Sequence, residues 1–187
     1  MSATQIVITI IVVLVVVALA AFAWMTMRRR ALRTRFGPEY DRVLSEQDSV
    51  SAAERELRAR ERRHSELELR PLDAQAHQRY TAAWEDVQAK FVDAPTEAVG
   101  EAHELVTQLV DERGYPTDDH DEQLATLSVD HARTLGHYRD AHEIYELNSR
   151  GEATTEQLRQ ALVHYRALFA DLLGEDSMVP TPDDSRP

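Results

Sequence analysis

Residues 6–27 read IVITIIVVLVVVALAAFAWMTM, and this run decides how the fold begins. It contains no charged side chain, and only Thr9 and Thr26 are not hydrophobic. At about 1.5 Å per residue, a helix of this length spans about 33 Å, more than the roughly 30 Å hydrocarbon core of a bilayer. Many of its residues are β-branched, but lipid offers the backbone no hydrogen-bond partner, which favours a helix over a strand. The run therefore predicts a transmembrane helix.

The same run has a second interpretation, the apolar core of a cleaved signal peptide. Small residues suited to cleavage occur at 18–23. A signal peptide, however, has a basic start and a shorter apolar core, whereas residues 1–5 carry no charged side chain. We favour the uncleaved anchor on its length and its flanks.

Basic residues crowd the carboxyl side of this run. No acidic residue precedes Glu39. The positive-inside rule therefore predicts a single-pass protein of the plasma membrane, with its N-terminus outside and residues 28–187 in the cytoplasm. We expect residues 6–35 to contact lipid, with the basic side chains at anionic headgroups. These membrane-surface residues are Arg28, Arg29, Arg30, Arg33 and Arg35.

Composition excludes several classes of function. The 187 residues include no cysteine, which rules out disulfides, thiolate metal sites and a cysteine nucleophile. Lys and Arg number 21 against 33 Asp and Glu, and this net charge of −12 argues against nucleic-acid binding. The sequence contains neither a phosphate-binding loop nor the Gly-x-Ser-x-Gly motif of a hydrolase. The sequence thus contains no catalytic signature, which favours a non-enzyme without deciding the question, and we expect no cofactor.

Helical signals organise the rest of the chain, and no useful period-2 alternation predicts a strand. The predicted fold is all-α, with a transmembrane helix, a charged stalk helix and an antiparallel helical bundle in the cytoplasm. Residues 28–70 form the basic juxtamembrane collar and the stalk, and residues 71–174 form a four-helix-type bundle. Residues 175–187 are acidic and proline-rich, and we expect them to be disordered.

Local signals place the individual helices. The stalk helix, over about 52–67, starts at a capping box of Ser51 and Glu54 and is polar all round, so we expect it to be solvated. Asp73, Asp130 and a Thr154–Gln157 capping box mark the starts of later helices. Helices are predicted at about 38–46, 74–91, 95–112, 131–149 and 155–173, with a short one through Leu124 and Leu127.

A polar face of the last two long helices is the candidate site. The triplet His-Tyr-Arg occurs at 137–139 and again at 164–166, and in each copy the tyrosine falls on the apolar face. Two copies are too few for a repeat array, so we attribute them to chance or to similar packing demands. The candidate residues of the polar face, together with the tyrosines that border it, are His131, Tyr138, His142, His164 and Tyr165.

The eight histidines raise the question of a metal site. No two of them are spaced i,i+3 or i,i+4, the spacing of ligands on one helix. Mixed pairs do occur, His137 with Asp140 and His142 with Glu146. A site would need different helices, such as His131 or His142 with His164. We therefore predict no metal site.

Several segments together resemble a known group of proteins. In order along the chain they are FGPEYDR (36–42), AEREL (53–57), FVDAP (91–95), RGYP (113–116), SVDH (128–131) and HYRALF (164–169). They are similar to small membrane-anchored actinobacterial proteins usually labelled hypothetical or secreted. The resemblance implies no activity, ligand or catalytic residue. We keep the cytoplasmic prediction, because the arginine cluster outweighs the label.

Two functional hypotheses follow. The first is a non-catalytic adaptor or scaffold that binds another protein at the inner membrane face and that could self-associate as a homo-oligomer. The alternative is a sensor or an enzyme of unrecognised type that uses the His/Tyr/Arg face. A concave pocket gathering His131, Tyr138, His142 and Tyr165 would favour the alternative, and a filled core would favour the adaptor.

Overall fold

The computed structural model describes residues 3–174, and within that range the chain forms eight helices and no strand. The predicted all-α fold is confirmed. The tail 175–187, for which we predicted disorder, lies outside the described residues. The chain divides into two compact units between Leu57 and Arg58, and each is described here by itself.

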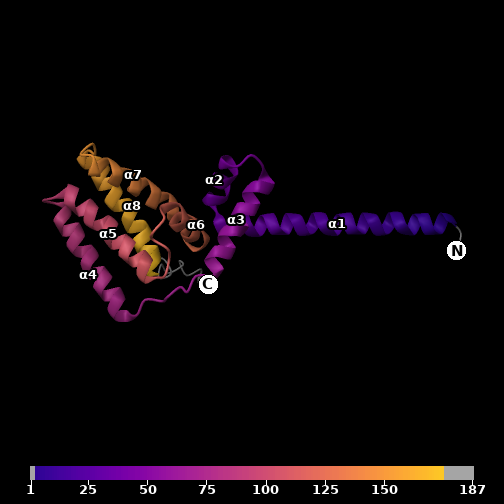
Figure 1. Ribbon diagram of the computed structural model, residues 1–187, viewed down its shortest axis with the longest axis horizontal. Coiled ribbons are helices and arrows are strands. Elements are labelled where there is room, and N and C mark those ends of the chain that lie inside the picture. The colour runs from indigo at the N-terminus through magenta and orange to yellow at the C-terminus, as the bar shows by residue number, and fades with distance from the viewer. Residues whose placement is uncertain (1–2, 175–187) are drawn as a thin grey trace, which may run out of the picture. The chain divides into compact units, whose positions relative to one another are not determined.

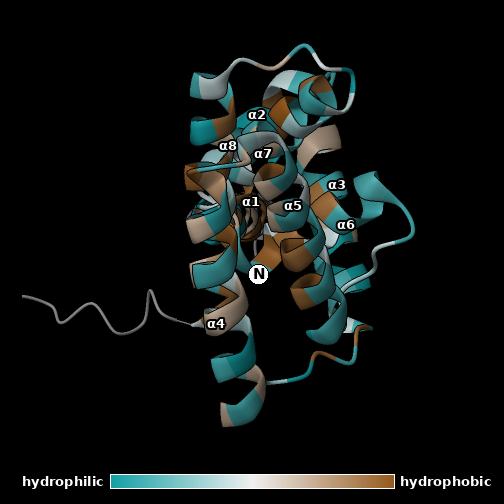
Figure 2. Ribbon diagram, turned by 90° about the vertical axis from the view of Figure 1, so that its left-hand side faces the viewer, coloured by the Kyte–Doolittle hydropathy of each residue, from teal (hydrophilic) through white to brown (hydrophobic). Residues whose placement is uncertain are grey.

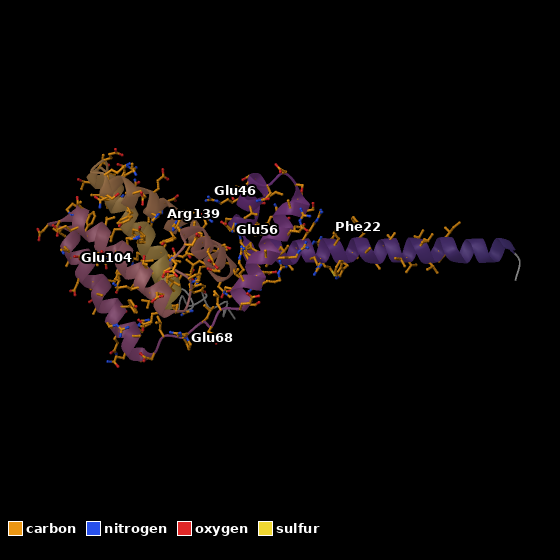
Figure 3. The ribbon with its side chains drawn as sticks, in the orientation of Figure 1. Phe22, Glu46, Glu56, Glu68, Glu104 and Arg139 are labelled. Carbon is orange, nitrogen blue, oxygen red and sulfur yellow. The ribbon has the colours of Figure 1, made fainter. Side chains whose placement is uncertain are left out.

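The first unit begins with one long helix, α1 (Ala3–Phe36). Its stretch Ile11–Phe36 is long and apolar enough to cross a membrane, and large apolar side chains such as Phe22 are exposed along it (Figure 3). The helix continues without interruption through the predicted span and the basic collar. It ends at Phe36, and Gly37, with a φ of 46°, separates it from α2 (Pro38–Glu46), the helix predicted from Pro38.

The start of α3 (Val50–Ser65) differs from the predicted one. Ser49 Oγ accepts a hydrogen bond from Ala52 N at 3.2 Å, so Ser49, not Ser51, caps the first turn. The carboxylate of Glu54, the other residue of the predicted capping box, is buried, and its Oε1 lies 2.9 Å from Nε of Arg29. Both serines are good capping residues, and the helix begins at Val50, earlier than the Ser51 signal predicted.

The solvated stalk predicted for this helix is wrong on one face. Ala53, Glu54 and Leu57 are all buried there, with Leu57 fully so. The buried apolar stripe consists of only Ala53 and Leu57, one turn apart. So short a stripe does not outweigh the surrounding Arg and Glu in the sequence pattern. Leu32, Phe36, Tyr40 and Val43 are likewise buried, and α1 contacts α2.

The second unit is a bundle of four long helices with a short fifth. They are α4 (Ala74–Phe91), α5 (Pro95–Glu112), α7 (Leu135–Ser149) and α8 (Thr155–Leu173), with α6 (His120–Asp130) against α7. Helix α4 packs on α5, α5 on α8, and α8 on α7 (Figure 1). The loops within the pairs α4/α5 and α7/α8 are short, so these neighbours are antiparallel.

Side-chain caps fix the starts of α4 and α8, as predicted. Asp73 accepts from Ala76 N at 2.7 Å, and Thr154 and Gln157 form the predicted capping box. Asp130 does not cap α7, which begins four residues later than predicted. Asp130 instead ends α6, and its carboxylate lies 2.9 Å from Nε2 of His64.

The core is one continuous apolar cluster inside the bundle. Each helix carries hydrophobic residues along with hydrophilic ones, as expected of amphipathic helices (Figure 2). The largest fully buried side chains of the bundle are Trp84, Tyr138, Tyr165, Leu109, Leu127, Leu135, Leu168 and Leu172.

Candidate functional site

The two tyrosines of the predicted polar face lie in the core. Tyr138 is 1% exposed and Tyr165 is 0% exposed, and their rings meet edge to face with centroids 6.1 Å apart. Tyr138 donates to Oε1 of Gln123 at 3.0 Å, and the hydroxyl of Tyr165 lies 3.0 Å from Nδ1 of His103. Burial raises the pKa of Tyr138 to about 12 and that of Tyr165 further. Both hydroxyls therefore stay neutral and serve packing.

His131 belongs to a different cluster. It is buried, its Nδ1 lies 2.9 Å from Oδ2 of Asp171, and its ring meets Tyr115 edge to face. Thr134 also donates to Oδ2 of Asp171 at 2.6 Å. Burial raises the pKa of the Asp171 carboxyl, but the hydrogen bonds from His131 and Thr134 outweigh burial and hold that pKa below its usual value. This cluster joins the start of α7 to the end of α8.

Rings from α5, α6 and α7 surround His142. His120 stacks on it with centroids 4.2 Å apart, and His103 lies 5.4 Å away and stacks on Tyr145 at 4.0 Å. Burial lowers the pKa of His103 to about 4, and positive charge on His142 or His120 lowers it further. The pKa of His142 is lowered too, first by burial and then by His120. The predicted site omitted His103 and His120, because no spacing along the chain connects α5 and α6 to His142 on α7. It also omitted Tyr145, although the i,i+3 spacing from His142 places both on one face of α7.

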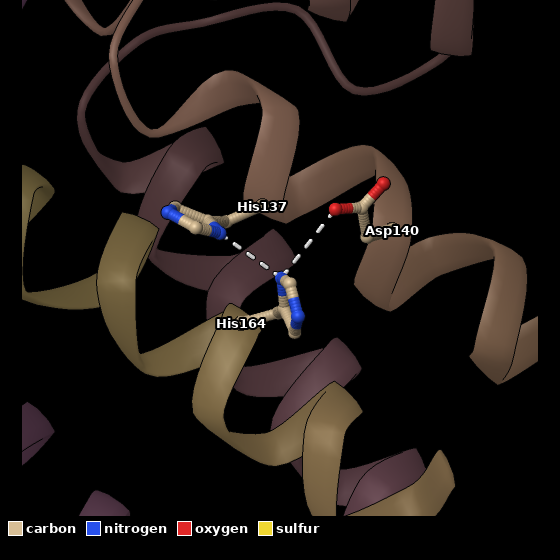
Figure 4. A group of neighbouring side chains, drawn as sticks. All are labelled: His137, Asp140 and His164. Atoms are coloured by element: carbon tan, nitrogen blue, oxygen red, sulfur yellow. Dashed lines mark hydrogen bonds and ion pairs between the residues drawn. The ribbon is translucent and has the colours of Figure 1, made fainter.

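The two copies of the His-Tyr-Arg triplet face each other across α7 and α8. His137 and His164 bring their Nδ1 atoms within 3.0 Å, and Oδ2 of Asp140 lies 3.7 Å from Nδ1 of His164 (Figure 4). All three ligand-type atoms lie within 4.8 Å of one another. The sequence contains the His137/Asp140 pair, but only the packing of α8 on α7 brings His164 to it.

Two shallow cavities open on the surface of the bundle. The larger, about 200 Å³, lies between α4 and α5, and the smaller, about 160 Å³, between α4 and α8. None of the five predicted polar-face residues lines either one. The larger is lined by Ala83, Asp86, Val87, Glu101, Glu104, Leu105 and Gln108, and the smaller by Thr81, Trp84, Glu85, Gln88, Arg166 and Phe169.

Several of the predicted membrane-surface arginines contact an aromatic or acidic side chain of the first unit. Arg28 lies over the ring of Trp24, 4.2 Å from its centroid. Arg29 pairs with the buried Glu54, and Arg33 lies 3.0 Å from Oδ1 of Asp41. The side chain of Arg33 remains 66% exposed, and that of Arg29 remains 47% exposed. The arginines thus have a local structural role in the first unit in addition to the predicted contact with lipid.

Comparisons with known protein families, with curated proteins and with solved structures found no match to this chain. The resemblance to membrane-anchored actinobacterial proteins therefore stays a prediction.

Proposed function

We propose that this chain is a single-pass protein of the plasma membrane with its N-terminus outside, and that its cytoplasmic bundle is a non-catalytic adaptor for another protein. The observation that carries the proposal is the filled interior behind the predicted polar face. Tyr138 and Tyr165 occupy the core there, so no substrate could reach their hydroxyls. The candidate membrane-spanning helix α1 and its following arginines support the anchor and its orientation.

The larger of the two cavities, which forms a groove between α4 and α5, is our candidate for the partner surface. Val87 and Leu105 supply apolar contact, while Asp86, Glu101 and Glu104 supply carboxylates, and Glu104 is labelled on α5 in Figure 3. Lys90 pairs with Glu101, so one of these carboxylates is already matched by a cation. Such a groove suits a basic amphipathic segment, which would place its apolar side chains inward and its cations at the rim.

Photo-crosslinking of the full-length protein in its native membrane tests this adaptor function. A crosslinking residue at Gln108, in the groove, is expected to capture a defined protein partner. The same residue at Gln160, which is exposed on α8, is the matched control and should not capture it. Glu104→Lys should abolish capture at Gln108, because it places a cation where the partner's own cations would lie. Equal capture at both glutamines, or capture that survives Glu104→Lys, would contradict the assignment of this groove as the partner surface.

The alternative function is a sensor built on the histidine-rich face. The contact of His103 with Tyr165 and its stack on Tyr145 favour it, because a proton taken up by this ring would disturb the helix packing. An enzyme is less well supported, because the tyrosines of that face are committed to the core.

A further inference from the structure

We propose that His137, Asp140 and His164 form a binding site for a divalent transition metal ion of the zinc class, on the outer side of the α7/α8 pair. This inference is independent of the adaptor function. It also revises the sequence prediction of no metal site, which considered His131 or His142, not His137, as the partner of His164.

The ligand atoms already stand close to the required geometry. Metal–nitrogen and metal–oxygen bonds of about 2.0–2.2 Å in a tetrahedral site separate neighbouring ligand atoms by roughly 3.3–3.6 Å. The two Nδ1 atoms are 3.0 Å apart, and Oδ2 of Asp140 is 3.7 Å from Nδ1 of His164. These two separations bracket the tetrahedral value, and the third, between His137 and Asp140, is within 4.8 Å. Side-chain rotation of the exposed Asp140 would bring its carboxylate to both histidines and complete the site. Water would fill the fourth position.

The fold holds these ligands in place through the residues beside them. His137 and Asp140 are spaced i,i+3 and so share one face of α7. Tyr138 and Tyr165, the neighbours of the two histidines, pack against each other in the core. This contact fixes the register of the antiparallel helices, and it explains why the two triplets meet. The His-Tyr-Arg repeat thus presents one histidine from each helix on the outside of the same pair.

The donor set selects the kind of ion. Two imidazole nitrogens and one carboxylate suit zinc, nickel or copper, whereas calcium and magnesium prefer oxygen ligands. Without an ion, the two Nδ1 atoms lie at hydrogen-bond distance, with one ring as donor and the other as acceptor. The side chain of Asp140 is 62% exposed and that of His164 is 25% exposed, so an ion can enter directly from solvent. Binding would tie the N-terminal turns of α7 to the middle of α8.

Calorimetric titration of the full chain in detergent with zinc chloride tests the site. We expect one equivalent to bind with micromolar affinity, and magnesium chloride to give no signal. Loss of residues that only orient metal ligands costs about 10–100-fold in affinity. His137→Ala and His164→Ala, which remove ligands themselves, should therefore each weaken binding at least about 10-fold. His77→Ala, which removes a histidine of α4, is the matched control and should bind as wild type.

A second measurement separates loss of the site from loss of the fold. Cobalt(II) should give the visible absorption bands of a tetrahedral ion, and these bands should disappear in Asp140→Asn, whose exposed side chain leaves the core untouched. Circular dichroism of each metal-free variant should match that of wild type. Absence of zinc binding in the folded wild type, or binding that His164→Ala leaves unchanged, would overturn the proposal.

Discussion

Trp84 of α4 stacks on Phe169 of α8, with ring centroids 4.7 Å apart and planes inclined by 26°. Tyr80, one turn earlier on α4, meets the same phenylalanine edge to face at 6.4 Å. Phe169 thus receives two aromatic rings from α4 and joins that helix to α8. The indole nitrogen of Trp84 is buried and has no hydrogen-bond partner in the part of the chain that the structure describes.

Trp84→Ala should lower the free energy of unfolding by about 3–5 kcal/mol, because it removes a large buried ring and leaves a cavity. Trp84→Phe should cost less, since it keeps an aromatic contact with Phe169 and removes the unpartnered N–H. Thermal unfolding of the full chain in mild detergent, followed by near-ultraviolet circular dichroism, measures both changes. An unchanged melting temperature in Trp84→Ala would show that this face is not core.

Gly114→Ala should destabilise the bundle by at least about 1–3 kcal/mol, because its positive φ of 90° strains any L side chain. An added Cβ would also lie 2.6 Å from the carbonyl oxygen of Glu68, too close for that backbone to remain in place. Thermal unfolding of the full chain, as for the Trp84 variants, measures this loss of stability.

Gly100→Ala is the matched control for Gly114→Ala and should have the opposite sign. Gly100 lies inside α5, and a Cβ there would meet nothing within 4 Å. Alanine should therefore stabilise the helix by up to about 1 kcal/mol. If both substitutions shifted the melting temperature in the same direction, the close approach of Gly114 to Glu68 would be contradicted.

Stability should fall as pH drops from 6.5 towards 4, because His103 stays neutral in the fold while its unfolded counterpart takes up a proton. The folded pKa is about 4 and the ordinary value 6.5, so stability is fully present above 6.5 and is lost below it. The loss should be on the order of 1–2 kcal/mol once solvent screening at this partly exposed ring is allowed for. The groups facing His103 are Tyr165, Tyr145, His142, His120 and Glu146.

His103→Gln tests the assignment of this pH dependence. Glutamine offers Tyr165 a hydrogen-bonding group without a titratable ring, so the melting temperature should vary less with pH between 6.5 and 4. His77→Gln is the control and should retain the wild-type slope. A slope unchanged in His103→Gln would assign the effect to other groups.

A reporter fused after Pro187 should lie in the cytoplasm if the arginine cluster sets the orientation. A fluorescent protein that folds only in the cytoplasm should be bright there, and alkaline phosphatase, which needs an oxidising compartment, should be inactive. Replacing the five arginines by glutamine should weaken or invert this preference. Phosphatase activity in the wild-type fusion would refute the orientation and, with it, the cytoplasmic adaptor.

Signals that act within one helix could be read from the sequence alone. The apolar run at 6–27, Pro95 at the start of α5 and the Thr154–Gln157 box each fix a helix through its own residues. The structure confirms the helices that they predict. The buried tyrosines could also be placed, because the 3.6-residue period puts them on the apolar face.

Only the tertiary structure decided which polar groups meet. Asp130 pairs with His64 instead of capping α7, and His137 meets His164 on α8. Such contacts depend on how far each helix is rotated about its axis and shifted along its neighbour. The packing of the whole core sets that rotation and shift, so no spacing within a single helix records them.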